Sequence, residues 1–316
     1  MSNKAKKIAI IGTGLVGMSY AYSLLNQGIG DVLVLIDINK ERAIGEAMDL
    51  NHGLAFAPKK MTIYAGDYED TKDCDLIVIT AGVAQKEGET RIDLLKRNAV
   101  DMKQIVSNVM KHGFNGIFLV ATNPVDILSH IVWRESRMPA SRVIGSGTIL
   151  DTARLRYEIS NHVHINSKNI HAYILGEHGD SEFVCWSNAS ISVKPLLEVI
   201  DERDDINLSD MEKIYENVRD AAYNIISKKN ATYYGIGMSL ARITKIIIED
   251  QRSILPVSTL VNGQYDGVNQ IHISVPAILG IDGVIEIVKL NLNEIEIKKL
   301  KESADIISNS LKSIGY

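Results

Sequence analysis

A single histidine surrounded by carboxylates is the first feature of this sequence that could do chemistry. Residues 176–182 are GEHGDSE, which places His178 beside Glu177, Asp180 and Glu182. One imidazole and three carboxylates can bind a divalent cation. The segment can also be a solvated turn, or the histidine can act as an acid and base near neutral pH. The seven residues alone leave all three interpretations open.

A glycine-rich turn near the N-terminus is typical of dinucleotide binding. Gly12, Gly14 and Gly17 follow an apolar run in G-x-G-x-x-G order and open a segment with helical spacing. The first glycine permits a tight turn, the second lets the backbone approach a pyrophosphate, and the third packs helix against strand. Asp37 ends the next apolar run, where a carboxylate binds an adenosine ribose and repels a 2′-phosphate. The pattern predicts NAD rather than NADP.

Two polar segments follow later apolar runs, at the edge where open α/β sheets bind ligands. Residues 80–91, TAGVAQKEGETR, can form a lid that carries Gln85 and Arg91 over a substrate, or an ordinary surface loop. In residues 121–126, ATNPVD, Asn123 can bind a substrate oxygen or nicotinamide, or can cap a helix.

The segment LDTARLR adds a possible ion pair to these candidates. Asp151 and Arg154 are three residues apart, which places them on one face of a helix. An aspartate can orient a histidine, and an arginine can hold a carboxylate through two hydrogen bonds. An exposed ion pair of little energetic value is the alternative.

The elements that must position these residues change character near residue 147. Before it, nearly continuous apolar runs suit parallel strands covered on both faces; they occupy 7–12, 31–37, 75–82, 116–124 and 142–147. Helical segments such as 14–28 and 92–112 alternate with them, which predicts a doubly wound, Rossmann-type parallel sheet.

The second half mixes helices with shorter strands. Helical spacing is found over 149–162, 210–229, 231–250 and a last segment with Leu300, Ala304, Ile307, Leu311 and Ile314 on one face. Strand-like segments are 170–175, 183–191, and 253–263 with 269–280, the last two antiparallel and joined at an Asn262-Gly263 turn. We expect an α/β protein with a Rossmann domain over 1–147 and a closely packed α+β substrate domain with antiparallel strands over 148–316.

Composition excludes several other classes of protein. The chain has 316 residues, 46% of them hydrophobic, and a net charge of −5 without a basic block, which argues against nucleic acid or an anionic membrane as partner. No window has 18 consecutive apolar residues, and the N-terminus lacks a secretory pattern. Cys74 and Cys185 are expected to be buried, reduced thiols, so we expect a cytoplasmic protein.

Taken in chain order, these motifs resemble the lactate/malate dehydrogenase family. GTGLVG, Asp37, AGVAQKEGETR, TNPVD, DTAR and GEHGDSE occur in register along essentially the whole chain, and ATYYGIGMSLARI makes it most similar to bacterial L-lactate dehydrogenases. The resemblance implies reversible hydride transfer between NADH and pyruvate to give (S)-lactate, the last step of fermentative glycolysis. It also implies a homo-oligomer, with a tetramer expected.

The resemblance assigns a role to each candidate residue. His178 is the catalytic acid and base, Asp151 bonds its other ring nitrogen, and Arg91 polarises the reacting carbonyl. The substrate-binding positions are Gln85, Arg91, Asn123, Arg154 and Thr232, of which Arg154 grips the carboxylate. The NAD-binding positions are Gly12, Gly14, Val16, Gly17, Asp37, Arg42, Tyr68, Gly82, Val83, Ala121, Asn123 and Ser146.

Gln85 distinguishes between substrates. In this family an arginine at the position pairs with the second carboxylate of oxaloacetate, whereas a glutamine leaves a neutral pocket that suits a methyl group. A second carboxylate would be buried without a partner beside Gln85, which is costly. The sequence therefore favours pyruvate; a malate dehydrogenase or a broader 2-hydroxy acid dehydrogenase is the alternative.

Arg156 and His171 match a regulatory site of the bacterial members. On a helix Arg156 points about 200° away from Arg154, and an arginine and a histidine at these positions bind fructose 1,6-bisphosphate across a subunit interface. Two unrelated surface cations are the alternative interpretation.

Two rivals from other classes are disfavoured. NAD-dependent glycoside hydrolases of similar fold need metal-binding Cys and His residues, and Cys74 and Cys185 lack such a setting. A non-catalytic relative would have lost the histidine or the arginines. With Asp151 as partner of His178 and arginines supplying positive charge, GEHGDSE is interpreted as part of a catalytic site without a metal.

Overall fold

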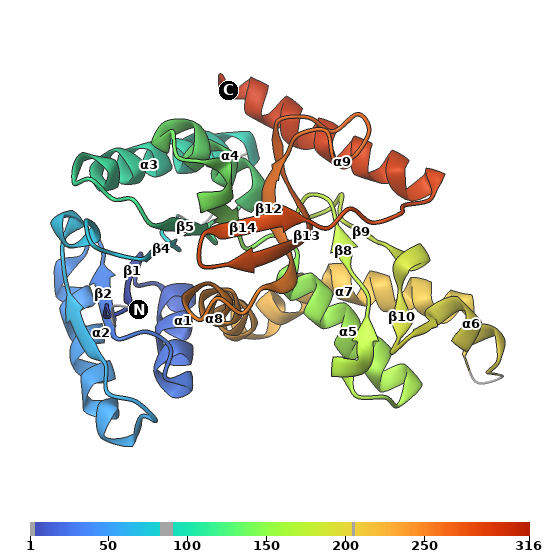
Figure 1. The fold of residues 1–316 in the computed structure, drawn as a ribbon, viewed down its shortest axis with the longest axis horizontal. Helices are drawn as coiled ribbons and strands as arrows, with labels where there is room; N and C mark the ends of the chain where they lie inside the picture. The colour runs from blue at the N-terminus through green and yellow to red at the C-terminus, as the bar shows by residue number, and fades with distance from the viewer. Residues whose placement is uncertain (1–3, 83–90, 204–205) are drawn as a thin grey trace.

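One nine-stranded sheet runs through the protein. The computed structural model describes residues 4–82, 91–203 and 206–316, without the Arg91 side chain, and Figure 1 shows the arrangement of its elements. In spatial order the strands are β3 (Thr62–Ala65), β2 (Val32–Ile36), β1 (Lys7–Ile11), β4 (Leu76–Ile79), β5 (Ile117–Val120), β6 (Val143–Gly145), β12 (Ser253–Val261), β13 (Ile271–Gly280) and β14 (Gly283–Ile287). The first six are parallel and the last three antiparallel. The predicted parallel and antiparallel parts are therefore confirmed.

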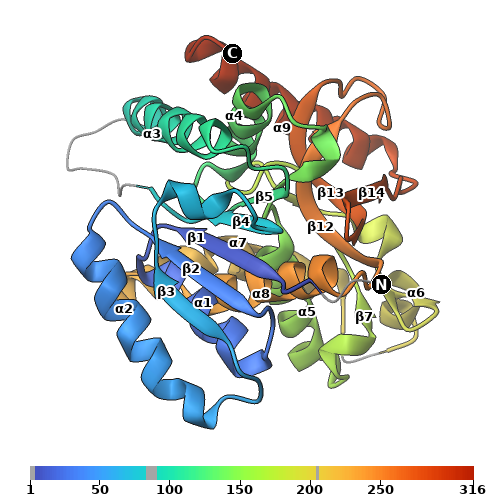
Figure 2. The same ribbon diagram turned by 60° about the vertical axis from the view of Figure 1, so that its left-hand side comes forward.

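Helices cover both faces of the parallel part of this sheet (Figures 1 and 2). One face packs against α3 (Arg91–Lys111), α4 (Val125–Ser136) and α9 (Glu294–Ser313), and the other against α1 (Leu15–Gln27), α2 (Lys40–Gly53) and α8 (Tyr234–Ile248). Successive side chains of β1 enter the two cores in turn, with Ile8 and Ile10 in one and Ala9 and Ile11 in the other. This double burial explains why the strands are continuous apolar runs.

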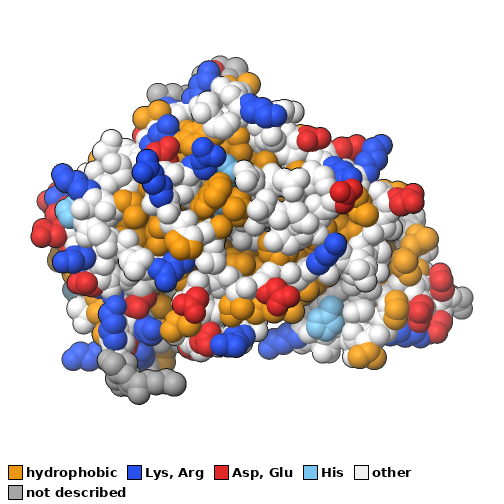
Figure 3. Space-filling view, turned by 45° about the horizontal axis from the view of Figure 1, so that its top comes forward, with side chains coloured by type: hydrophobic (Ala, Val, Ile, Leu, Met, Phe, Trp, Pro, Cys, Tyr) orange, Lys and Arg blue, Asp and Glu red, His pale blue; other side chains and the backbone are white. Residues whose placement is uncertain are grey.

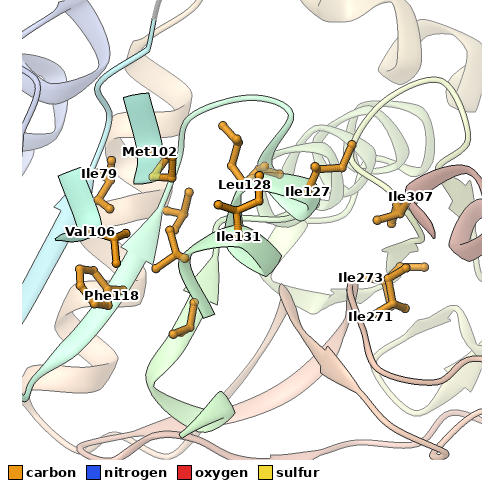
Figure 4. Close-up of a cluster of buried hydrophobic side chains, with 14 of the residues drawn as sticks. Ile79, Met102, Val106, Phe118, Ile127, Leu128, Ile131, Ile271, Ile273 and Ile307 are labelled. Carbon is orange, nitrogen blue, oxygen red and sulfur yellow. The ribbon is translucent and has the colours of Figure 1, made fainter. Parts of the chain in front are cut away.

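Figure 4 shows part of the first of these cores. Ile79 of β4 and Phe118 of β5 project from the sheet toward Met102 and Val106 of α3. All four side chains are at most 1% exposed. Burying a large apolar side chain contributes roughly 1.5–3 kcal/mol to the stability of the fold, relative to leaving it exposed. The packing of these side chains therefore holds β4 and β5 against α3.

A third core belongs to the second half of the chain. It lies between α5 (Ile149–Val163), α6 (Leu196–Asp201), α7 (Leu208–Lys229) and short strands. Three of these, β7 (Ile170–His171), β10 (Ser190–Ile191) and β11 (Lys194–Pro195), form one sheet, and β8 (Ile174–Leu175) pairs with β9 (Phe183–Val184). The GEHGDSE segment connects β8 to β9.

Five single-turn 3-10 helices complete the described elements. They are η1 (Leu54–Phe56), η2 (Tyr68–Thr71), η3 (Ala140–Arg142), η4 (Ser167–Asn169) and η5 (Trp186–Asn188). Cys74 and Cys185 are both free and buried, as predicted.

The structure corrects three expectations about local structure. The edge strand β3 was not predicted, because only one of its four residues is fully buried. The expected strand over 170–175 is divided into β7 and β8, and that over 183–191 into β9 and β10 around η5. The expected turn at Asn262-Gly263 is only the start of a longer connection, since residues 262–270 join β12 to β13 and the tight turn lies between Tyr265 and Val268.

The surface carries charges of both signs. On the face shown in Figure 3, lysine and arginine side chains are interspersed with aspartate and glutamate. Among the described residues, no helix is both long enough and apolar enough to cross a bilayer.

Candidate active site

The glycine-rich turn forms an open cradle at the start of α1. Gly12 has a φ of 105°, and an added Cβ would meet the Ala81 backbone; at Gly17 it would overlap the Gly12 carbonyl oxygen. An added Cβ at Gly14 would meet nothing within 4 Å. Gly14 is also the N-cap of α1, whose first turn contains no acidic side chain and whose cap makes no side-chain hydrogen bond. This free helix N-terminus fits the pyrophosphate of a dinucleotide.

Asp37 supports the cradle from the end of β2. Its Oδ2 accepts hydrogen bonds from the Thr13 backbone N (2.7 Å) and Oγ1 (2.9 Å), and its Oδ1 accepts one from Asn39 N (2.9 Å). Burial opposes ionisation of Asp37, but these hydrogen bonds hold its pKa below the usual value. An ionised carboxylate at this place can accept hydrogen bonds from a ribose. Sequence reasoning identified Asp37 but missed Thr13 as its partner.

The other predicted NAD-binding residues lie along the same sheet edge. Tyr68, Gly82, Ala121 and Ser146 each follow the carboxyl end of a parallel strand, after β3, β4, β5 and β6 respectively. The Ala121 backbone N–H bonds to Ile79 and that of Ser146 to Val120, which keeps these connections beside the sheet. Val16 lies half-buried in the first turn of α1. Arg42 is exposed in the first turn of α2, where it pairs with Glu46 at 3.7 Å. Val83 lies outside the described residues.

The half-buried His178 and the buried Asp151 form the chemical centre of the second half. The His178 Nδ1 lies 2.7 Å from Asp151 Oδ2, and Asp151 is 2% exposed. Burial disfavours the imidazolium, but the charge and hydrogen bond of Asp151 raise the pKa of His178 well above its usual value. Burial likewise opposes ionisation of Asp151, yet His178 and Arg154 lower its pKa. The pair therefore favours the protonated imidazole and leaves Nε2 to exchange the proton.

Arg154 shares the carboxylate of Asp151. Its Nη1 donates to Asp151 Oδ1 at 2.9 Å, one turn along α5, and its side chain is 15% exposed. The alternative of an exposed ion pair is thus excluded. The Asp151 carboxylate therefore binds the His178 imidazole through one oxygen and the Arg154 guanidinium through the other.

Thr148, the N-cap residue of α5, and Thr152 within the helix place α5 against β8. Thr148 Oγ1 donates to the Ile174 carbonyl at 2.6 Å, and Thr152 Oγ1 accepts from Ile174 N at 3.0 Å. Asp151 lies between these two threonines, so their bonds bring it next to the turn that follows β8.

Three further elements hold the backbone around His178. Asp126 of α4, 1% exposed, accepts from His178 N at 2.8 Å and from Ser274 Oγ of β13 at 3.3 Å. Ser303 Oγ of α9 accepts from Glu177 N at 2.6 Å. The sequence did not identify these three residues. The one indication it offered was Asp126, a carboxylate at a position where the apolar periodicity of α4 predicts a buried residue.

The other predicted substrate-binding residues are partly described. Asn123 follows β5, and Asn98 of α3 donates to its carbonyl at 3.1 Å. Asn123 does not cap α4, because the N-cap is Pro124. Thr232 lies half-buried between α7 and α8. Gln85 and the side chain of Arg91 lie outside the described residues.

The two residues of the predicted regulatory site, Arg156 of α5 and His171 of β7, lie on neighbouring elements. Arg156 Nε donates to the Ala172 carbonyl at 3.1 Å, and its guanidinium lies 4.9 Å from the Tyr173 ring centre. His171, adjacent to Ala172, is exposed.

The described part of the chain contains one group with the composition of a metal site. Ligand atoms of Asp151, His178 and Glu182 all lie within 4.8 Å of one another. Arg154 already supplies a positive charge to Asp151, and the raised pKa of His178 favours a second one beside both carboxylates. A cation would have to displace the proton that the pair holds, so the arrangement favours acid–base chemistry.

Comparison with known proteins identifies relatives along the whole chain. Residues 6–145 match the profile of the lactate/malate dehydrogenase NAD-binding domain, and residues 148–315 match that of the lactate/malate dehydrogenase alpha/beta C-terminal domain. An L-lactate dehydrogenase from Geobacillus sp. (strain WCH70) is 53% identical over 96% of this chain and 95% of its own.

Solved structures agree with the sequence relatives. A lactate dehydrogenase from a Medee basin deep-sea metagenome library has 61% identity and a TM-score of 0.98, covering 99% of this chain and 100% of its own. The minor L-lactate dehydrogenase of Enterococcus mundtii, in its ligands-bound form, has 45% identity and a TM-score of 0.96, covering 98% of each chain.

Proposed function

The chain belongs to the lactate/malate dehydrogenase family and catalyses the NAD-dependent interconversion of pyruvate and L-lactate. We propose that the residues described above carry out this reaction. The observation that carries the assignment is the shared carboxylate of Asp151. It places the proton donor His178 and the cation Arg154 side by side. A 2-oxo acid has its carbonyl next to its carboxylate, which matches that spacing of donor and anchor.

His178 and Asp151 handle the proton in this proposal. NAD(H), held at the Gly14 cradle and Asp37, supplies the hydride when bound. The protonated His178 donates from Nε2 to the carbonyl oxygen of pyruvate and accepts the proton back in lactate oxidation. Asp151 stabilises the imidazolium and fixes its orientation, while Asp126 fixes its backbone.

Charged and polar groups orient the substrate. Arg154 binds the pyruvate carboxylate through two parallel hydrogen bonds, which restrains the carbonyl relative to His178. Arg91, which begins α3, adds positive charge at the developing oxyanion. Asn123 lies beside the carbonyl and Thr232 lines the pocket.

The division of the chain and its setting are also proposals. We place the boundary between the NAD-binding and substrate domains at residues 147 and 148. We further propose a cytoplasmic homotetramer that performs the last step of fermentative glycolysis. Support for an oligomer comes from an apolar hollow of about 560 Å³ between α1 and α8, where Tyr22, Tyr234 and Met238 are more than half exposed.

Substrate preference tests the assignment directly. The parent should have a higher kcat/KM for pyruvate than for oxaloacetate, and Gln85→Arg should shift the ratio toward oxaloacetate by about 10²-fold, since the arginine pairs with the second carboxylate. Gln85→Met, which adds no charge, is the control and should leave oxaloacetate disfavoured. Steady-state kinetics with both substrates measure this, and a parent that prefers oxaloacetate contradicts the pyruvate assignment.

Fructose 1,6-bisphosphate should lower the KM for pyruvate of the parent. We propose that Arg156 and His171 bind its phosphates where two subunits meet, which relieves repulsion between their cations and favours the active assembly. The response should disappear in the Arg156→Gln/His171→Gln double variant. Inorganic sulfate at equal concentration is the ligand control. A KM for the parent that does not respond to the bisphosphate refutes the regulatory site.

A further inference from the structure

A second buried carboxylate lies beside the His178–Asp151 pair and has no role in the proposed reaction. Glu182 is 5% exposed, and its Oε2 lies 3.8 Å from His178 Nδ1. This distance is too long for a hydrogen bond. It is short enough for the two charges to interact strongly in a buried site.

The backbone of Glu182 is fixed at both ends. Its N–H donates to the Gly179 carbonyl at 3.2 Å, and its carbonyl accepts a hydrogen bond from the Tyr215 hydroxyl of α7. Because the Glu182 side chain is also buried, its carboxylate stays next to the imidazole and away from solvent.

The groups facing Glu182 include both signs of charge. Asp151 interacts with it from α5, Tyr215 from α7, and His178 from its own turn, which also carries Glu177 and Asp180. Arg154 pairs with Asp151. Burial raises the pKa of Glu182 to about 7, the His178 imidazolium opposes this rise, and the Asp151 carboxylate adds to it. Glu182 therefore ionises at a higher pH than an exposed glutamate.

We propose that Glu182 is a positioning residue that adjusts, through its own charge, how strongly His178 holds its proton. This inference rests on the proposed role of His178 as proton donor. An ionised Glu182 stabilises the imidazolium, whereas a protonated Glu182 leaves that task to Asp151 alone.

The direction of the effect suits pyruvate reduction, which consumes one proton per turnover. As the pH falls, Glu182 takes up a proton, and His178 releases its own proton to the substrate more readily. The carboxylate of pyruvate, bound at Arg154, adds negative charge nearby and further favours the protonated form of Glu182. The pH dependence of the reaction therefore reflects two coupled groups.

The test compares two variants that each remove one carboxylate charge. In the free protein, NMR titration of the His178 ring should show its apparent pKa lowered by about one unit in Glu182→Gln, because an opposite charge within 4–6 Å shifts a pKa by one to three units. Asp180→Asn, an exposed change two residues from His178, should leave the titration unchanged. Glu182→Asp, which retains a carboxylate, should lie between the parent and Glu182→Gln.

Kinetics provide the second measurement. The alkaline limb of kcat/KM for pyruvate should move to lower pH in Glu182→Gln, by the same amount as the ring titration. A role in packing alone would lower the rate without moving the limb. A His178 titration identical in the parent and Glu182→Gln overturns the inference. Failure of the parent to reduce pyruvate would instead overturn the proposed function, and it would leave the titration interpretable.

Discussion

Replacing His178 with asparagine is expected to lower kcat for pyruvate reduction by about 10²–10⁴-fold, which is the usual contribution of general acid catalysis. The imidazole is the proton donor that Asp151 holds at 2.7 Å, and asparagine cannot donate a proton and then take it back. Stopped-flow measurement of NADH oxidation gives the chemical step. Binding of NADH, followed by its fluorescence, should stay within twofold, because the Gly14 cradle belongs to another part of the fold.

The control for this variant is His52→Asn. His52 is exposed in the last turn of α2, so its loss should change neither kcat nor NADH binding. A His178→Asn protein that keeps more than a tenth of the parent kcat would contradict the assignment of His178 as the acid.

Arg154→Lys is expected to reduce kcat/KM for pyruvate by roughly 10²-fold, most of it through KM. A lysine keeps the positive charge but offers no planar fork, so one of two charged hydrogen bonds to the substrate carboxylate is lost. A hydrogen bond to a charged group contributes roughly 1.5–3 kcal/mol, which corresponds to a factor of about 10–10². The substitution also loosens Asp151, whose Oδ1 accepts from Arg154 at 2.9 Å.

Arg219→Lys is the matched control for this change, since Arg219 is a half-exposed residue of α7 paired with its neighbour Asp220. Steady-state kinetics with pyruvate should not distinguish it from the parent. If Arg154→Lys retained the parent KM, the substrate carboxylate would have to bind elsewhere.

The parallel strands could be predicted because their burial leaves a local trace. Each is an apolar run covered on both faces, so composition alone marks it. The strand β3 left no such trace, since it lies at the sheet edge with a single buried residue, Ile63. Strands β7 and β8 have only two residues each, too few to show an alternation of apolar and polar side chains.

The candidate site was predictable only in part. Asp37 and the glycines follow from a fixed spacing within one βαβ unit. His178 and Asp151 are 27 residues apart and were paired through the family resemblance, which the structure supports with a 2.7 Å contact. The contacts of Asp126 and Ser303 with the backbone at His178 and Glu177 span 52 and 126 residues, and no local pattern reports such pairings.

The continuity of the sheet from β6 to β12 has a consequence for how the protein is made. Ser258 of β12 pairs with Gly145 of β6, more than a hundred residues earlier in the chain. During synthesis, β6 therefore remains an unpaired sheet edge until α5, α6, α7, α8 and then its neighbour β12 have been made. An unpaired strand edge is a template for association with other chains. The nascent protein therefore has an interval in which this edge is open to pairing with a neighbouring chain.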